Sequence, residues 1–377
     1  MLLAGIGLSL HLNGGEAPLP KLPPETFRRI VFLGDSITDG NTYPLLVQSA
    51  LFGACVCEVT TINAGIGGDT AEGMHKRLAR DVLDKKPTLV TFNAGANDSL
   101  HGVSVEVYES HVRGIAKELK DAGITLVLLT PNVMSGAPDK KAGATLAAYE
   151  TVLRKVARDF NLRIGEVRVR QEEDRARGAI ILAPDDLHPN YEGQRMIARA
   201  ALDAFGYSTA RVPQRPAHLK PSPGVLSSWK MKAYGAKEAL PKDAEIAALK
   251  PDGAWKDYAL PDPKPFAEGD ENNLWQDDFR RQGGAVALNE RVGGGNRFIG
   301  FAALECARPR KVIFNTGADL QRVYLNGILI YEQKEFRGWH IGRQSVEAEL
   351  IAGKNTIAIQ CGSTFFLSVT DARMWIR

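Results

Sequence analysis

The stretch Arg29-Ile-Val-Phe-Leu-Gly-Asp-Ser36-Ile-Thr-Asp-Gly40 decides the fold of this chain. An apolar run ends there in Gly-Asp-Ser, and a glycine follows four residues after the serine. This pattern predicts a buried strand with a serine hydroxyl just past its carboxyl end. In open α/β sheets, ligands bind at the carboxyl ends of the strands. A serine at such a place is a nucleophile when a base and an oxyanion site converge on it.

Strand-like and helix-like runs alternate from about residue 28 to residue 206. The strand candidates are Arg29–Leu33, Glu58–Asn63, Thr88–Asn93, Thr125–Thr130 and Arg163–Val169. Most of them lack polar alternation, which predicts that both faces of their sheet are covered. The helix candidates are Tyr43–Gly53, Thr70–Lys86, Val105–Ala122, Thr145–Phe160 and Tyr191–Phe205. This succession predicts an α/β fold, with a parallel sheet between helices and right-handed crossovers.

The composition of the sequence changes after about residue 210, where prolines become frequent. Prolines punctuate residues 211–264, which predicts a linker that wraps a surface, with a short helix near Ala244–Leu249 capped by Asp243. Beyond it, short strand-like runs are separated by Gly and Asn turns, and Asn326-Gly327 is a strong hairpin signal. These runs predict an antiparallel β-sandwich. The expected division is a tail over 1–27, an α/β domain over 28–210, a linker over 211–264 and a β-sandwich over 265–377.

Composition narrows the class of protein. The 377 residues, 44% hydrophobic and 24% charged, are ordinary for a globular chain of two domains. The net charge of +3 and the lack of basic clusters interleaved with aromatics give no reason to expect nucleic acid. No run reaches the ~18–20 apolar residues of a membrane span. The apolar start, Met1–Leu10, lacks a basic region, so an export-signal remnant and a plain tail stay equal alternatives.

Four cysteines are too few to form the framework of a fold. Cys55 and Cys57 are separated by one residue, and in a strand their Cα atoms would lie about 6.6 Å apart, at the long end of disulfide geometry. We therefore expect no bond between them. For Cys306 and Cys361, both in strand-like runs, two buried thiols are favoured, with a disulfide as the alternative.

Three further segments carry groups that a serine nucleophile needs. Gly68 belongs to the glycine-rich segment that follows the second strand candidate, and N–H groups at the helix start there suit a developing negative charge. Asn97 follows the third strand candidate and offers an amide donor for an oxyanion. Asp185 precedes His188 by three residues, a spacing that lets the carboxylate orient the imidazole.

Taken singly, these segments have ordinary explanations as turns and helix starts. Together, at strand ends or before the last helix, they supply a nucleophile, oxyanion donors, a base and an orienter. The Gly-x-Ser-x-Gly elbow of another serine-hydrolase plan is absent. The glycines at 65, 67 and 68 complete no dinucleotide fingerprint, and the seven histidines lack paired ligand spacing, so we expect no cofactor and no metal. His75 and His111 are expected on helices, at the surface or in a second layer.

The order and spacing of these segments resemble the four blocks of the SGNH (GDSL) hydrolases, over roughly residues 28–206. The resemblance implies a flavodoxin-like α/β/α fold and an acyl-enzyme mechanism. It implies that Ser36 is the nucleophile, completed by His188 and Asp185, with Asp186 as the competing orienter. It also implies an oxyanion hole of the Ser36 N–H, the Gly68 N–H and the Asn97 side chain. Ala96 stands where the family usually has glycine or another small residue.

Residues 265–377 carry a second resemblance. Tyr324-Leu-Asn326-Gly327 and Leu350-Ile-Ala-Gly353-Lys-Asn355 are similar to the galactose-binding-like jelly-roll domains attached to many glycosidases and carbohydrate esterases. This implies an acylated carbohydrate as substrate. The sequence also offers tryptophans for stacking on sugars, although core or interdomain positions are favoured for them: Trp255, Trp275, Trp339 and Trp375.

The expected function is hydrolysis of short-chain, chiefly acetyl, esters on carbohydrate by a serine esterase. The lack of a long apolar lid segment favours short acyl groups. The alternatives are a lipid or simple acyl esterase or lysophospholipase, and a non-catalytic glycan-binding protein. A glycan substrate predicts a secreted or periplasmic location, with the cytoplasm as the alternative.

Overall fold

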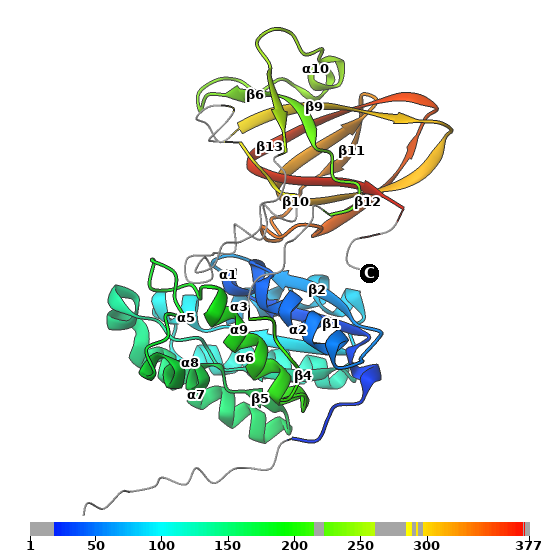
Figure 1. Cartoon of the computed structure of the whole chain (residues 1–377). Coiled ribbons are helices and arrows are strands. Elements are labelled where there is room, and N and C mark those ends of the chain that lie inside the picture. Colours follow the sequence, from blue (N-terminus) through cyan, green and yellow to red (C-terminus); the bar gives the residue numbers. More distant parts are fainter. Residues whose placement is uncertain are drawn as a thin grey trace, which may run out of the picture.

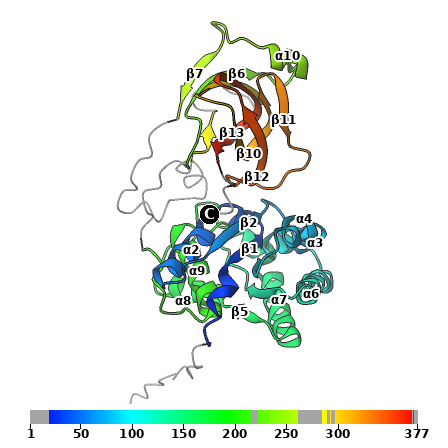
Figure 2. The same cartoon turned by 90° about the vertical axis from the view of Figure 1, so that its right-hand side faces the viewer.

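The computed structural model describes residues 19–214, 222–260, 284–288, 292, 297–371 and 373. Within these residues the chain forms a five-stranded parallel sheet and an eight-stranded antiparallel sheet (Figure 1, Figure 2). Of the expected tail over 1–27, residues 1–18 lie outside the described part. Pro24–Phe27 form a 3-10 helix, and Phe27 is fully buried, so the end of that segment belongs to the folded core.

The parallel sheet has the strand order β2-β1-β3-β4-β5. Its strands are β1 (Arg29–Gly34), β2 (Thr60–Gly65), β3 (Leu89–Asn93), β4 (Thr125–Leu129) and β5 (Arg163–Gly165). This is the flavodoxin-like order, and it confirms the predicted α/β class. The order reverses between β1 and β3, and ligands bind outside the carboxyl ends of the strands at such a reversal. Ser36 follows β1 directly.

Helices cover both faces of this sheet (Figure 2). In β1, Ile30 and Phe32 pack toward one apolar cluster, and Val31 and Leu33 pack toward the other. The first cluster is built with α2 (Thr42–Gly53) and α9 (Tyr191–Phe205), and the second with α3 (Ala71–Lys76), α4 (Leu78–Asp81), α6 (Val105–Asp121) and α7 (Gly136–Phe160). The buried run in β1 therefore faces helices on both sides, as its lack of polar alternation predicts.

Two of the predicted elements are cut short or divided. The strand expected over Arg163–Val169 stops at Gly165, and the helix α8 (Val167–Ala176) begins two residues later. Val167 and Gln171, four residues apart on one face of this helix, are both buried. The single helix expected over Thr70–Lys86 is divided into α3, α4 and a 3-10 turn, with Arg77 non-helical between α3 and α4 at φ −100°. The short helices α1 (Ser36–Asp39) and α5 (Ala96–Leu100) were not predicted.

The second sheet has the order β11-β10-β13-β9-β6-β7, with β12 paired to β10 and β8 to β13. Its strands are β6 (Ser228–Tyr234), β7 (Lys256–Ala259), β8 (Val286–Ala287), β9 (Arg297–Cys306), β10 (Arg310–Leu325), β11 (Ile328–Glu332), β12 (Gln344–Leu350) and β13 (Gly353–Thr370). Such an antiparallel sheet fits a β-sandwich. Asn326 and Gly327, at φ 50° and 83°, join β10 to β11, which confirms the predicted hairpin.

The segment 211–264 is more than the predicted linker, because it contributes β6 and β7 to this sheet. No proline lies between residues 224 and 240, so prolines flank β6 rather than interrupt it. Trp229 and Met231 of β6 are buried in the sheet's apolar cluster. The predicted short helix is α10 (Asp243–Ala248), with Lys242 at its N-cap and Asp243 as its first residue, a correction of the cap by one position.

The four cysteines are unpaired. Across β9 and β13, Cys306 pairs with Gly353 and Cys361 pairs with Phe298. The two thiols therefore lie at opposite ends of the strand pair, about 27 Å apart at the rise of a strand. That separation excludes the alternative of a disulfide and leaves two buried thiols, the favoured interpretation.

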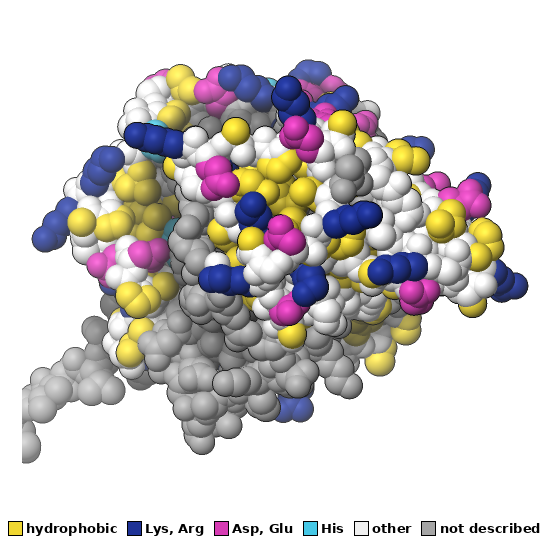
Figure 3. All heavy atoms as spheres, turned by 90° about the horizontal axis from the view of Figure 1, so that it is seen from above, with side chains coloured by type: hydrophobic (Ala, Val, Ile, Leu, Met, Phe, Trp, Pro, Cys, Tyr) yellow, Lys and Arg dark blue, Asp and Glu magenta, His cyan; other side chains and the backbone are white. Residues whose placement is uncertain are grey.

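The length of the helices and the distribution of surface charge indicate which partners the chain could bind. No helix in the described ranges is long and apolar enough to cross a membrane. Figure 3 views the molecule from above, toward the antiparallel sheet, and shows acidic and basic side chains interspersed with apolar ones. No patch of a single charge sign covers the described residues on this face.

Candidate active site

A tight strand–turn–helix connection places Ser36 at the end of β1. Asp35 caps α1, its Oδ1 accepting the Ile37 N–H at 3.0 Å. A Cβ on Gly34 would lie 2.0 Å from Thr38 Oγ1 and 3.0 Å from Asn93 O, so only glycine fits where the strand turns into the helix. The serine therefore begins α1 at the carboxyl edge of the sheet.

Ser36, His188 and Asp185 form one chain of hydrogen bonds. Ser36 Oγ lies 2.8 Å from His188 Nε2, and His188 Nδ1 lies 2.6 Å from Asp185 Oδ2. Asp185 Oδ1 also accepts the Leu187 N–H at 3.1 Å and the His188 N–H at 3.0 Å. The three-residue spacing thus folds into a turn that holds the carboxylate against the ring.

The neighbouring carboxylate takes a different position. Asp186 has a positive φ of 60°, and its Oδ1 accepts a hydrogen bond from Ser135 Oγ. Burial raises the pKa of Asp185, but the hydrogen bonds from His188 and Leu187 outweigh it and lower that pKa below the ordinary value. The lowered pKa keeps Asp185 a charged acceptor, whose Oδ2 lies 2.6 Å from His188 Nδ1. Asp185, rather than Asp186, therefore contacts the imidazole.

The three predicted oxyanion donors lie at the ends of β1, β2 and β3. The N–H groups of Ser36 and Gly68 meet no acceptor among the described residues. Gly68 has φ 81°, a conformation that favours glycine, and nothing lies within 4 Å of the point where a Cβ would stand. Asn97 Nδ2 donates to Asp69 O at 3.0 Å and lies 3.5 Å from Asp35 Oδ2, which holds the amide beside the serine's turn.

Buried carboxylates surround this turn. The pKa of Asp35 is raised to about 7, chiefly by burial and to a smaller extent by the nearby Asp98 and Asp69, against the hydrogen bond from the Ile37 N–H, which lowers it. Burial likewise raises the pKa of Asp98 to about 6, although the Ala71 N–H donates to both of its oxygens. The pKa of Asp69 is also raised by burial, opposed by Arg77. The site therefore holds three acids whose pKa values are raised above the ordinary value.

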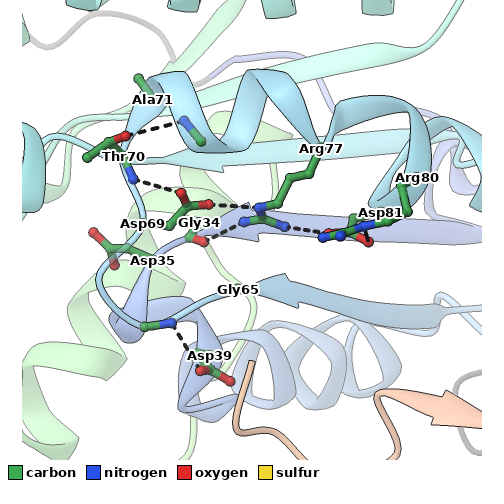
Figure 4. Close-up of polar contacts among 12 residues, drawn as sticks. Gly34, Asp35, Asp39, Gly65, Asp69, Thr70, Ala71, Arg77, Arg80 and Asp81 are labelled. Atoms are coloured by element: carbon green, nitrogen blue, oxygen red, sulfur yellow. Dashed lines mark hydrogen bonds and ion pairs between the residues drawn. The ribbon is translucent and has the colours of Figure 1, made fainter. Parts of the chain in front are cut away.

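Arg77 is a residue of the site that sequence reasoning missed. Figure 4 shows its guanidinium between Asp69, Asp81 and Gly34. Its Nε donates to Asp69 Oδ2 at 2.7 Å, its Nη1 to Asp81 Oδ2 at 3.1 Å, and its Nη2 to Gly34 O at 3.1 Å. The side chain is 8% exposed. It ties the glycine-rich turn after β2 to the end of β1, and an arginine inside an amphipathic helix gave no sequence signal for that role.

A second unpredicted residue is Asp39, which is fully buried in α1. It binds the connection between β11 and β12, residues 333–343, which we call the docking loop. Asp39 accepts the Trp339 N–H at 2.8 and 2.9 Å and the His340 N–H at 2.9 Å, and His340 Nδ1 lies 3.0 Å from its Oδ1. Its Oδ2 also accepts the Gly67 N–H at 3.2 Å. One carboxylate therefore joins α1, the glycine-rich turn and the docking loop.

Charged contacts extend the same interface. Arg80 pairs with Glu335 of the docking loop, and Arg337 Nη1 lies 3.9 Å from Asp81 Oδ1. Asp81 also accepts from Arg77, so the interface charges connect directly to the arginine beside the site. The two sheets therefore meet through polar contacts at the edge of the candidate active site.

His75 and His111 lie on helices α3 and α6, as expected. His75 Nδ1 and His111 Nδ1 are 3.1 Å apart, and His75 Nε2 lies 2.9 Å from Glu118 Oε1. Their meeting across α3 and α6 was not predicted, because 36 residues separate them. No group of three or more potential ligands suited to a metal ion occurs in the described part of the chain.

At the carboxyl edge of this flavodoxin-like sheet, a serine hydroxyl contacts an imidazole, which in turn contacts a carboxylate. Serine hydrolases use this arrangement. Residues 32–196 match the GDSL-like Lipase/Acylhydrolase family. An acetylxylan esterase from Geobacillus stearothermophilus is 26% identical over 211 residues, covering 48% of this chain and 96% of the relative. An arylesterase from Vibrio mimicus is 32% identical over 107 residues, covering 27% of this chain and 53% of the relative.

Among solved structures, a variant of an acetyl xylan esterase from Geobacillus stearothermophilus aligns with a TM-score of 0.46 and 25% identity, covering 48% of this chain and 96% of that chain. The sequence match over residues 32–196 establishes a GDSL/SGNH hydrolase domain. With its esterase relatives, it makes this protein a carboxylic ester hydrolase of that type.

Proposed function

We propose that this hydrolase removes short acyl groups, principally acetyl, from carbohydrate through an acyl-enzyme on Ser36. The observation that carries the proposal is the 2.8 Å contact between Ser36 Oγ and His188 Nε2. In this assignment His188 is the general base and Asp185 holds and stabilises its protonated ring. The Ser36 N–H, the Gly68 N–H and the Asn97 side chain form the oxyanion hole.

The proposed reaction has two halves. His188 Nε2 takes the proton from Ser36 Oγ as that oxygen bonds to the ester carbonyl carbon, and the oxyanion donors receive the negative charge. The carbon–alcohol bond then breaks, and His188 gives its proton to the leaving alcohol. Water repeats the sequence on the acyl-enzyme: His188 takes its proton, the carboxylic acid leaves, and the proton returns to Ser36 Oγ.

The carbohydrate assignment rests on two supports. The relative that this chain matches over 96% of its length is an acetylxylan esterase. The antiparallel sheet after residue 222 fits a sandwich, and its motifs resemble galactose-binding-like jelly rolls. We propose that this second part is an accessory domain that begins before β6, after a catalytic domain over 28–210. A polysaccharide substrate favours a secreted or periplasmic location.

Simple acyl esters are the second candidate substrate class, because an arylesterase is also among the relatives. The test compares acetate release from acetylated xylan and pectin with hydrolysis of p-nitrophenyl acetate and p-nitrophenyl octanoate. We expect the acetylated polysaccharides and the acetate ester to be turned over, and the octanoate poorly. Preference for octanoate, with no acetate released from either polysaccharide, would assign the second class instead.

The nucleophile is tested separately. A fluorophosphonate should label the wild-type chain on Ser36, and Ser36→Ala should lose both the label and nearly all turnover, since the members of a triad act as a unit. Wild-type activity in a folded Ser36→Ala variant would show that the mechanism is wrong, whatever the substrate.

A further inference from the structure

The docking loop brings an aromatic ring to the nucleophile. A Cβ placed on Gly67 would lie 3.7 Å from Trp339 Cδ1 and 3.9 Å from Ser36 Cβ. Gly67 directly precedes Gly68, whose N–H is a proposed oxyanion donor. The indole and the serine therefore border the same small space above the glycine-rich turn, although they come from opposite ends of the chain.

The position of this ring is fixed by contacts that do not involve the ring itself. Asp39 accepts the backbone N–H groups of Trp339 and of its neighbour His340. A Cβ on Gly338 would lie 2.5 Å from Gly65 O, so the loop backbone presses directly against the end of β2. The indole thus projects from a backbone that is already anchored beside the site.

The ring also has room to meet a ligand. Trp339 is only half-buried, and it packs edge-to-face on Phe336 with ring centroids 5.3 Å apart. Phe336 is 37% exposed, so the aromatic pair runs from the serine outward to solvent. A partly exposed tryptophan beside a reactive group still offers part of its surface to a ligand, and aromatic side chains bury large apolar areas on contact. Sites for small ligands are commonly lined by such rings.

We propose that Trp339 is a specificity-determining residue, and that the second sheet supplies one wall of the ester-binding site. The ring packs against the sugar of the alcohol moiety. An acetyl group is small and needs only the space at the carbonyl, whereas the alcohol of an acetylated glycan must extend into solvent, along the direction that Trp339 and Phe336 line. The inference rests on the proposed carbohydrate esterase function and adds which residue recognises the alcohol.

The test uses the full chain and three acetates that share one acyl group. These are an acetylated xylo-oligosaccharide, p-nitrophenyl acetate and ethyl acetate, whose alcohol is too small to reach the indole. Trp339→Ala should lower kcat/KM about tenfold for the first two, the scale of one lost aromatic contact, and less than twofold for ethyl acetate. Trp339→Phe should recover most of the loss.

Phe52→Ala is the matched control, because Phe52 is an aromatic residue, 46% exposed, near the end of α2. It should change none of the three rates. The anchoring N–H of residue 339 survives every substitution there, so thermal midpoints of the variants should stay close to that of the wild type.

The outcomes separate this inference from the proposed function. A wild-type chain that hydrolyses ethyl acetate and p-nitrophenyl acetate but not the sugar acetate contradicts the carbohydrate assignment, and the wall is then judged on the aryl ester alone. Equal losses on all three acetates in Trp339→Ala would show that the ring only supports the site's structure. Unchanged rates on all three would show that it does not contact substrate.

Discussion

His340 Nδ1 lies 3.0 Å from Asp39 Oδ1, across 301 residues of sequence. Both side chains are almost completely buried, at 6% and 0% exposure. A buried carboxylate is tolerated only when its charge or its lone pairs are compensated, and Asp39 obtains most of its donors from the docking loop. The hydrolase part of the chain therefore contains a buried carboxylate that accepts hydrogen bonds from both parts, from Gly67 in its own part and from Trp339 and His340 in the second.

Replacing Asp39 should weaken both parts. Asp39→Ala leaves the N–H groups of Gly67, Trp339 and His340 without their acceptor, and we expect the free energy of unfolding to fall by about 2–4 kcal/mol. Urea denaturation followed by far-UV circular dichroism measures this for the whole chain, and tryptophan fluorescence reports the second part alone, since all five tryptophans lie after residue 222. Asp121→Ala, which breaks an exposed pair with Lys117, should cost less than about 1 kcal/mol. Equal effects of the two substitutions would contradict the role of Asp39.

Substitutions of the adjacent carboxylates Asp185 and Asp186 should have very different effects on kcat. Asp185→Asn keeps the shape of the side chain but removes the charge that holds the His188 ring, so kcat should fall about 10³–10⁴-fold. Asp186→Asn, at a positive φ that asparagine accepts readily, should keep kcat within about threefold. Steady-state rates on p-nitrophenyl acetate measure both. Comparable losses in the two variants would reverse the assignment of the orienter.

Asn97 should act on the transition state more than on substrate binding. Asn97→Ala removes one donor of the proposed oxyanion hole, and we expect kcat to fall about 10²–10³-fold with KM changed little. Fluorophosphonate labelling of Ser36 should still be detectable, because the hydroxyl and its base remain in place. A rise in KM at unchanged kcat would assign Asn97 to ground-state binding instead.

Asp35 should make stability depend on pH. Its pKa of about 7 in the folded chain exceeds the ordinary value of 3.8, so between these values the folded chain holds a proton that the unfolded chain has released. The free energy of unfolding therefore falls as pH rises from about 4 to about 7. Asp35→Asn removes the contribution of Asp35 to this dependence, and should be more stable than the wild type by up to about 4 kcal/mol at pH 8 and by much less at pH 4.

Unfolding curves at the two pH values check this prediction. The asparagine can still accept the Ile37 N–H, so the cap of α1 survives. A stability difference between wild type and Asp35→Asn that is the same at both pH values would show that the carboxyl is not protonated on folding.

The parallel sheet was predictable because its signal is local. Each buried strand is a short apolar run, and chemistry-bearing residues follow the ends of β1 and β3. Ser36, Asp185 and His188 could be assembled from sequence because parallel strands bring their carboxyl ends to one edge, and because the Asp–His spacing acts within a single turn. Strand and helix limits shifted where tertiary contacts decided them, as at Val167, where burial at helical spacing overrode β-like alternation.

The docking loop could not be predicted in the same way. Asp39 lies three residues after Ser36, and nothing in its sequence surroundings indicates that its partners are Trp339 and His340. The strands β6 and β7 could not be predicted for a related reason. The many prolines around them suggested a linker, and β6 pairs with β9, whose residues lie more than sixty positions further along the chain. Arg77 gave no signal because its three partners come together only in the folded chain.

The carboxylate of Asp39 also imposes an order of events during synthesis. The parallel sheet and all the groups proposed for catalysis are complete by residue 188, yet Asp39 receives the N–H groups of Trp339 and His340 only after some 150 further residues have been made. Until then the glycine-rich turn lacks part of its anchor and the indole is missing from the site. A nascent chain thus carries every group proposed for catalysis well before the docking loop exists, and we expect full activity only once that loop has bound Asp39.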